Sequence, residues 1–168
     1  MTLISKKYRN LNTKLHASRP GFGAFGHRWT DDVKHLAAEY DTFDILDYGC
    51  GKATLASSLD FPIHCYDPAV HEYSGDPKPC AIVICTDVLE HVEPENLRDV
   101  LQHIHSLTKS VAFLNISTRL ANKRLADGRN AHLIVKPSTW WYATLTEFFD
   151  VEAIDLSPTE YNVLVFPK

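Results

Sequence analysis

Short apolar runs recur along this chain and alternate with segments whose apolar residues are spaced three or four positions apart. Four of these runs have the length and composition of buried strands: residues 43–48, 62–67, 80–85 and 111–116. The run 80–85, Cys-Ala-Ile-Val-Ile-Cys, is apolar throughout. Such a strand should be buried on both faces, as in a parallel sheet.

Segments with helical periodicity separate the strand-like runs. They cover about residues 30–40, 52–59, 94–107 and 137–149. Two further strand-like runs, 151–156 and 161–166, flank Ser-Pro-Thr and predict a closing hairpin. This alternation predicts an α/β fold, in which a doubly wound, mostly parallel sheet ends in a C-terminal antiparallel hairpin.

Two stretches lack these patterns. Residues 1–29 are polar and irregular, and we expect them to form an N-terminal cap or arm on a main domain of residues 30–168. Their glycine-rich end, 20–26, is either a flexible connector or a segment that packs through Phe22 and Phe25. Residues 117–136 form a long polar connection, and connections of this length are often functional.

Composition narrows the class of protein. With 168 residues, of which 45% are hydrophobic, the chain can form one domain with a sizeable core. Its net charge of -4 argues against a large nucleic-acid interface, and the basic residues near the N-terminus are interpreted as a solvated segment. The four cysteines form no CxxC pair, and no run has the length of a membrane span or a leader. A reduced, cytoplasmic setting without membrane contact is the resulting expectation.

Candidate chemistry gathers where the first two strands end. Residues 47–51 read Asp-Tyr-Gly-Cys-Gly, and Asp67 ends the next strand. Glycines let backbone close around a ligand, and a carboxylate after the second strand can bind both ribose hydroxyls of an adenosyl group. A dinucleotide site fits less well, because Thr54 stands where the third glycine would be. The remaining alternative is a glycine turn that serves topology alone.

Three motifs together resemble those of the class I S-adenosylmethionine-dependent methyltransferases, in the branch that acts on small molecules. They are Ile-Leu-Asp-Tyr-Gly-Cys-Gly (45–51), Tyr-Asp (66–67) and Cys-Thr-Asp-Val-Leu-Glu-His (85–91). The resemblance covers residues 43–116 well and implies S-adenosyl-L-methionine as cofactor and S-adenosyl-L-homocysteine as product. It also implies the following cofactor-binding residues: Asp47, Tyr48, Gly49, Gly51, Tyr66, Asp67, Thr86 and Asp87.

The chain departs from this family after Asp67. Residues 68–79 are too few for the usual helix, third strand and further helix. We therefore expect the third strand to be missing or reduced, with the adenine side open or covered by residues 68–79. The acid that binds adenine in the family has no clear counterpart, and Asp76 is a poor candidate.

Methyl transfer from a sulfonium mainly requires alignment of the acceptor, with help from a base where the acceptor carries a proton. His132, in the long connection, and His91, after the strand 80–85, are the candidate catalytic residues. His91 has a purely structural alternative as a helix-capping residue. His103 and His105 face different sides of one predicted helix, and no metal site is assigned.

Candidate substrate-binding residues lie in three segments, and they are His27, Arg28, Asp127, Arg129, Asn130 and Trp140. Arg28 is suited to pair with the cofactor's carboxylate. Trp140 begins an aromatic triplet, 140–142, that either stacks on a sugar or base or packs in the core.

The acceptor class follows partly by exclusion. Residues 86–89, Thr-Asp-Val-Leu, differ from the [DNS]-P-P-[YF] element of amino-methylating DNA enzymes, and the chain lacks the Pro-Cys nucleophile of cytosine-C5 enzymes. We expect a methyltransferase of the EC 2.1.1 class acting on a small molecule, a sugar or a glycan precursor. The alternatives are an RNA or modified-nucleotide methyltransferase and a non-catalytic regulatory protein that binds S-adenosylmethionine.

Overall fold

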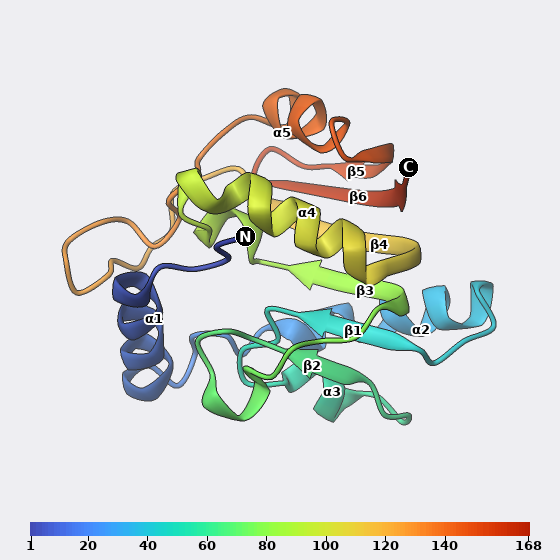
Figure 1. Cartoon of the computed structure of the whole chain (residues 1–168), viewed down its shortest axis with the longest axis horizontal. Coiled ribbons are helices and arrows are strands. Elements are labelled where there is room, and N and C mark those ends of the chain that lie inside the picture. Colours follow the sequence, from blue (N-terminus) through green and yellow to red (C-terminus); the bar gives the residue numbers. More distant parts are fainter.

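A six-stranded sheet with the order β2-β1-β3-β4-β6-β5 forms the centre of the computed structural model (Figure 1). The structure describes the backbone of residues 1–168 and all side chains except those of residues 153–156. The strands are β1 (Ile45–Tyr48), β2 (His64–Tyr66), β3 (Cys80–Thr86), β4 (Thr108–Ser117), β5 (Phe149–Leu156) and β6 (Glu160–Pro167).

The strand directions confirm the predicted fold class. β2, β1, β3 and β4 pair in parallel, and β6 pairs antiparallel with both β4 and β5. Between β2 and β3 the chain forms only one short 3₁₀ turn, His71–Tyr73, so the expected loss of a third strand is also confirmed. β2 is consequently the edge of the sheet.

Helices cover both faces of the sheet. α4 (Leu97–Leu107) and α5 (Ser138–Leu145) contribute to the hydrophobic cluster on one face. α2 (Thr30–Glu39), α3 (Thr54–Ser58) and the 3₁₀ turn Gly26–Trp29 contribute to the cluster on the other. Within β3, Val83 points into the first cluster and Ile82 into the second, because successive strand residues face opposite sides. The all-apolar run is therefore buried on both faces, as predicted.

The N-terminal segment corrects one prediction. Residues 1–29 were expected to be irregular, but Lys6–Ser18 form a helix, α1, whose N-cap is Ser5. α1 lies beyond the carboxyl ends of the parallel strands (Figure 1). It has few apolar residues, so its position depends on polar contacts: Ser5 binds Glu93, and Thr13 donates to the carbonyl of Ala69.

None of the helices in the described part of the chain is long and apolar enough to cross a membrane.

Candidate active site

The loop after β1 is shaped by two glycines with left-handed backbone. Gly49 has a φ of 81° and Gly51 a φ of 54°. The amides of Gly49 and Cys50 both donate to the carbonyl of Tyr66, at 2.7 and 3.1 Å, which ties the loop to the end of β2. A side chain at Gly49 would collide with Val88. Glycine is therefore required here by backbone conformation and by space.

The glycine-rich N-terminal segment packs against this loop. A Cβ atom on Gly51 would lie 2.6 Å from the carbonyl oxygen of Gly23. The amide of Lys52 donates to that same oxygen at 2.8 Å. Residues 20–26 are therefore packed, as one of the two interpretations expected, but the close contact is made by Gly23, and Phe25 is 55% exposed.

The carboxylate of Asp67 holds the end of this loop through two hydrogen bonds to backbone amides. Its Oδ2 accepts from the amide of Gly51 at 3.0 Å, and its Oδ1 accepts from the amide of Ala69 at 2.8 Å. Asp47 lies nearby and is also buried. Burial raises the pKa of Asp47 well above its usual range, and the neighbouring Cys65 and Asp67 raise it further. Together, Asp47, Asp67 and residues 49–51 are called the glycine wall below.

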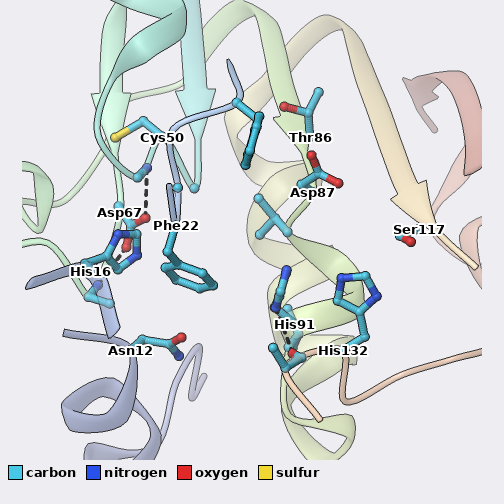
Figure 2. A pocket seen from close by; sticks show the side chains of 18 of the residues that line it. Asn12, His16, Phe22, Cys50, Asp67, Thr86, Asp87, His91, Ser117 and His132 are labelled. Atoms are coloured by element: carbon cyan, nitrogen blue, oxygen red, sulfur yellow. Dashed lines mark hydrogen bonds between the residues drawn. The ribbon is translucent and has the colours of Figure 1, made fainter. Parts of the chain in front are cut away.

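A cavity of about 510 Å³ opens beside the glycine wall. Two residues of α1, Asn12 and His16, also line it (Figure 2). Neither was identified from the sequence, because α1 itself was not predicted. The available signals were Ser5, a favourable N-cap, and the absence of Pro and Gly from residues 6–18.

Two histidines form the opposite side of the cavity. Figure 2 shows His91 and His132 together, across from Asp67 and His16, with the ring of Phe22 between the two sides. The rings of His91 and His132 are 4.8 Å apart and nearly perpendicular. The pair forms because the amides of Leu133 and Ile134 donate to the carbonyl of Glu90, which holds the long connection against residues 90–91.

Each of these histidines is oriented by a backbone carbonyl. His91 Nδ1 lies 2.8 Å from the carbonyl oxygen of Ala131, and His132 Nδ1 lies 2.6 Å from that of Arg119. A carbonyl only accepts, so both Nδ1 atoms carry a proton, and in the neutral form of each ring Nε2 keeps a free lone pair. Burial, with a smaller effect of His132, lowers the pKa of His91 to about 4, and its ring is neutral near pH 7.

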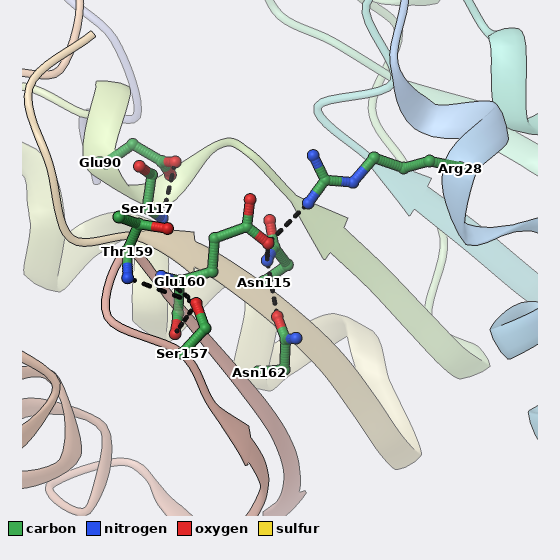
Figure 3. A network of polar contacts seen from close by, with 8 residues as sticks. All are labelled: Arg28, Glu90, Asn115, Ser117, Ser157, Thr159, Glu160 and Asn162. Carbon is green, nitrogen blue, oxygen red and sulfur yellow. Dashed lines mark hydrogen bonds and ion pairs between the residues drawn. The ribbon is translucent and has the colours of Figure 1, made fainter.

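A buried carboxyl group lies behind the histidines. Glu90 has no exposed surface, and its Oε1 accepts from the amide of Ser117 at 2.9 Å (Figure 3). Burial, with a smaller effect of Asp87, raises the pKa of Glu90 to about 8. Glu90, His91 and His132 are called the histidine wall below.

A polar network borders the histidine wall (Figure 3). Arg28 forms an ion pair with Glu160 at 2.6 Å, and Asn115 Nδ2 donates to the same carboxylate at 3.2 Å. Asp87, at the end of β3, has a φ of 55° and also lines the cavity. Burial raises the pKa of Asp87, although Arg28 partly offsets this effect.

Most residues predicted for the site do line this cavity. For the cofactor they are Asp47, Tyr48, Gly49, Gly51, Asp67, Thr86 and Asp87. For catalysis and substrate they are His91, His132 and Arg28. The Tyr48 hydroxyl, however, lies 2.9 Å from His103 Nδ1 in the core, so its ring supports the sheet.

The other predicted residues are not among those that line the cavity. Tyr66 packs on Tyr48, Trp140 packs on Trp141, and His27 is exposed. Asp127 and Arg129 pair with each other at 2.8 Å. Asn130 instead organises the long connection, because its side chain accepts from the amides of Ala121 and His132 and donates to the Ala121 carbonyl.

Several solved structures share this fold. A DhpI complex with S-adenosylhomocysteine has 13% identity and a TM-score of 0.64, with 98% of each chain covered. Magnesium protoporphyrin IX methyltransferase (ChlM) from Synechocystis PCC 6803, also with that ligand, has 15% identity and a TM-score of 0.60, covering 96% of this chain and 100% of its own. The 1,6-didemethyltoxoflavin-N1-methyltransferase of Burkholderia thailandensis has 13% identity and a TM-score of 0.60, covering 100% of this chain and 92% of its own.

No curated protein shows significant sequence similarity to this chain. The sequence pattern of a family described as "Methyltransferase domain" does match, over residues 22–155. That range contains the glycine wall, the histidine wall, strands β1 to β4 and all but the last residue of β5. The chain therefore belongs to the methyltransferase domain family.

Proposed function

We propose that this protein transfers a methyl group from S-adenosylmethionine to a polar small molecule, such as a sugar or glycan precursor. The observation that carries the proposal is the glycine wall. Its two left-handed glycines line the cavity, and two buried carboxyl groups flank them. In the described part of the chain the Asp47 carboxyl makes no hydrogen bond, so it is free to bind a cationic ligand group.

The residues of the glycine wall fit the parts of this cofactor. Asp67 uses one lone pair of each oxygen for a backbone amide and retains capacity to accept from the two ribose hydroxyls. Asp47 is suited to the ammonium group of the methionyl part. When bound, the cofactor supplies a methyl group on a sulfonium sulfur, which is an already activated electrophile.

The histidine wall is suited to the acceptor. His132 presents an Nε2 lone pair, held in place by its contact with the Arg119 carbonyl, and can take the proton that the acceptor atom loses as its lone pair bonds to the methyl carbon. The bond between that carbon and sulfur breaks at the same time, leaving its electron pair on sulfur. His91 is neutral and accepts a hydrogen bond from the acceptor.

The cavity supports a small acceptor. Its volume of about 510 Å³ lies within the range of small-molecule sites, and the charged network of Arg28, Glu160 and Asp87 suits a ligand with several hydroxyl groups. Structural neighbours are named for small acceptors: magnesium protoporphyrin IX in one and 1,6-didemethyltoxoflavin in another.

Calorimetry with S-adenosylmethionine tests the cofactor assignment. We expect binding by the unmodified chain and a loss of roughly 1.5–3 kcal/mol in Asp67→Ala, the scale of hydrogen bonds to a charged group. Asp127→Ala is the matched control, because this acid is not part of the cavity lining. No binding at millimolar ligand would overturn the proposal. An acceptor screen that follows release of S-adenosylhomocysteine then identifies the substrate.

A further inference from the structure

Three possible metal ligands converge in the histidine wall. Glu90, His91 and His132 each offer one ligand atom, and these atoms lie within 4.8 Å of one another. Bonds from Zn²⁺ to nitrogen or oxygen are about 2.0–2.2 Å long, so two ligand atoms on one ion are at most about 4.4 Å apart. Small side-chain rotations are enough to bring all three atoms onto a common ion.

The hydrogen bonds that His91 and His132 make are of the kind that metal-binding histidines usually make. A metal-binding histidine usually donates its second ring N–H to a carboxylate, a backbone carbonyl or water, which fixes the ring and the tautomer. His91 and His132 both do so, to the carbonyls of Ala131 and Arg119. Both Nε2 lone pairs are thereby left for a ligand in or beside the cavity.

Glu90 supplies independent evidence. Its side chain is fully buried, and Oε2 has no hydrogen-bond partner among the residues that the structure describes. Buried carboxyl oxygens are normally paired, because an unpaired one loses its hydration without compensation. A cation held between Oε2 and the two imidazoles provides the missing partner.

We propose that Glu90, His91 and His132 bind a divalent transition-metal ion. Two imidazoles with one carboxylate are typical of Zn²⁺, Mn²⁺, Fe²⁺ or Co²⁺, whereas Mg²⁺ and Ca²⁺ prefer oxygen ligands throughout. With an ion bound, His132 Nε2 would be a ligand rather than a base, and an acceptor oxygen in a remaining coordination position would lose its proton more readily. This role in holding the acceptor rests on the proposed function, but binding of the ion does not.

A second cluster of possible ligands, Asp44, His64 and Cys80, provides a matched comparison. The Asp44 carboxylate there already pairs with Lys109 at 3.0 Å, and the two side chains are 41% and 54% exposed. That cluster therefore has no unsatisfied buried oxygen to favour an ion. His132→Ala removes a possible ligand from the histidine wall, and His64→Ala removes one from the second cluster, so the two variants form a matched pair.

The test is metal binding by the full chain, after dialysis against a chelator and without cofactor or acceptor. Calorimetry with Zn²⁺ and visible absorption with Co²⁺ should both report one ion per chain. His132→Ala should weaken binding by more than the roughly 10–100-fold that follows loss of an outer hydrogen-bond partner. Glu90→Gln should weaken it too, and His64→Ala should not.

Each outcome decides the proposal. Binding that survives in both His132→Ala and Glu90→Gln, or that disappears in His64→Ala, overturns it, as does the absence of any one-to-one binding. Thermal unfolding of each variant without metal identifies a variant that fails to fold, and the other member of the pair then decides. Metal binding without S-adenosylmethionine binding would contradict the proposed function and support the metal site. S-adenosylmethionine binding without metal binding would contradict the metal site and leave the proposed function standing.

Discussion

The two walls of the cavity are built in different ways. The glycine wall comes from the ends of two neighbouring strands, and hydrogen bonds of backbone amides and carbonyls hold most of it in place. The histidine wall combines residues 90–91 with His132 from a long connection, and it acts through side chains. A wall of backbone tolerates little change and suits a ligand part that does not vary. A wall of side chains can be altered without changing the sheet, and it suits the part that distinguishes one enzyme from another.

The largest expected effect separates catalysis from cofactor binding. His132→Ala should lower turnover by about 10²–10⁴-fold, the range for loss of a general base, and leave the affinity for S-adenosylmethionine unchanged. Steady-state kinetics and calorimetry on the same preparation measure the two quantities. The exposed His35 of α2 provides the control variant, His35→Ala.

Equal losses of turnover and cofactor affinity in His132→Ala would show that the two walls act as one unit. Turnover that stays intact in both His132→Ala and His91→Ala would exclude a histidine base.

A second prediction tests the backbone character of the glycine wall. Gly128 has a φ of 87° and open space around it, so Gly128→Ala should cost only the strain of left-handed backbone, about 1–2 kcal/mol. Gly51→Ala should cost more, because its new methyl group would lie 2.6 Å from the Gly23 carbonyl oxygen. Urea unfolding measures both costs. Cofactor affinity should fall only in Gly51→Ala, and similar unfolding free energies for the two variants would contradict close packing at Gly51.

The third prediction concerns pH. Burial raises the pKa of Asp47, so this acid stays protonated to a higher pH than an ordinary aspartic acid. Only the carboxylate attracts a cationic ligand group, so cofactor affinity should rise with pH through this raised pKa, by at most about tenfold per pH unit for one proton. Calorimetry below about pH 7, where α-amino groups remain protonated, measures the slope. In Asp47→Asn the slope should vanish; a slope unchanged by this substitution would assign it to another group.

The smallest effect is expected at the border of the histidine wall. Arg28 and Glu160 are partly exposed, at 38% and 27% of their side chains, so solvent screens their ion pair. Arg28→Gln should lower the free energy of unfolding by less than about 1 kcal/mol, and added salt should reduce that difference further. Thermal unfolding at low and high salt checks this. A larger cost would show that the network supports the fold rather than the ligand.

The glycine wall was readable from the sequence because its signals are local. Two glycines after an apolar run, and an acid at the end of the next run, fix both the conformation and the edge of the sheet on which they meet. The short segment 68–79 likewise predicted the loss of a strand, which the sheet order confirms.

The histidine wall was only half readable. His91 and His132 were both identified, but their contact depends on Leu133 and Ile134 binding the Glu90 carbonyl, and no sequence pattern encodes that contact. Glu90 was not singled out, although it belongs to the 85–91 motif, because a glutamate beside apolar residues does not by itself show that its side chain is buried. Helix α1 was missed for a related reason: its stabilising contacts are with residues distant in the chain, such as Glu93 and Ala69.

Those contacts of α1 have a kinetic consequence. The helix is anchored near the histidine wall, where the Tyr8 hydroxyl donates to the His91 carbonyl, and near the glycine wall, where Thr13 donates to the Ala69 carbonyl. Asn12 and His16 of α1 line the cavity, so we expect α1, held by these two hydrogen bonds, to contact a ligand that fills it. We expect exchange of product for fresh cofactor to require that at least one of these two hydrogen bonds breaks. Thr13→Val removes one of them, so it should speed product dissociation in stopped-flow measurements without changing the methyl-transfer step itself.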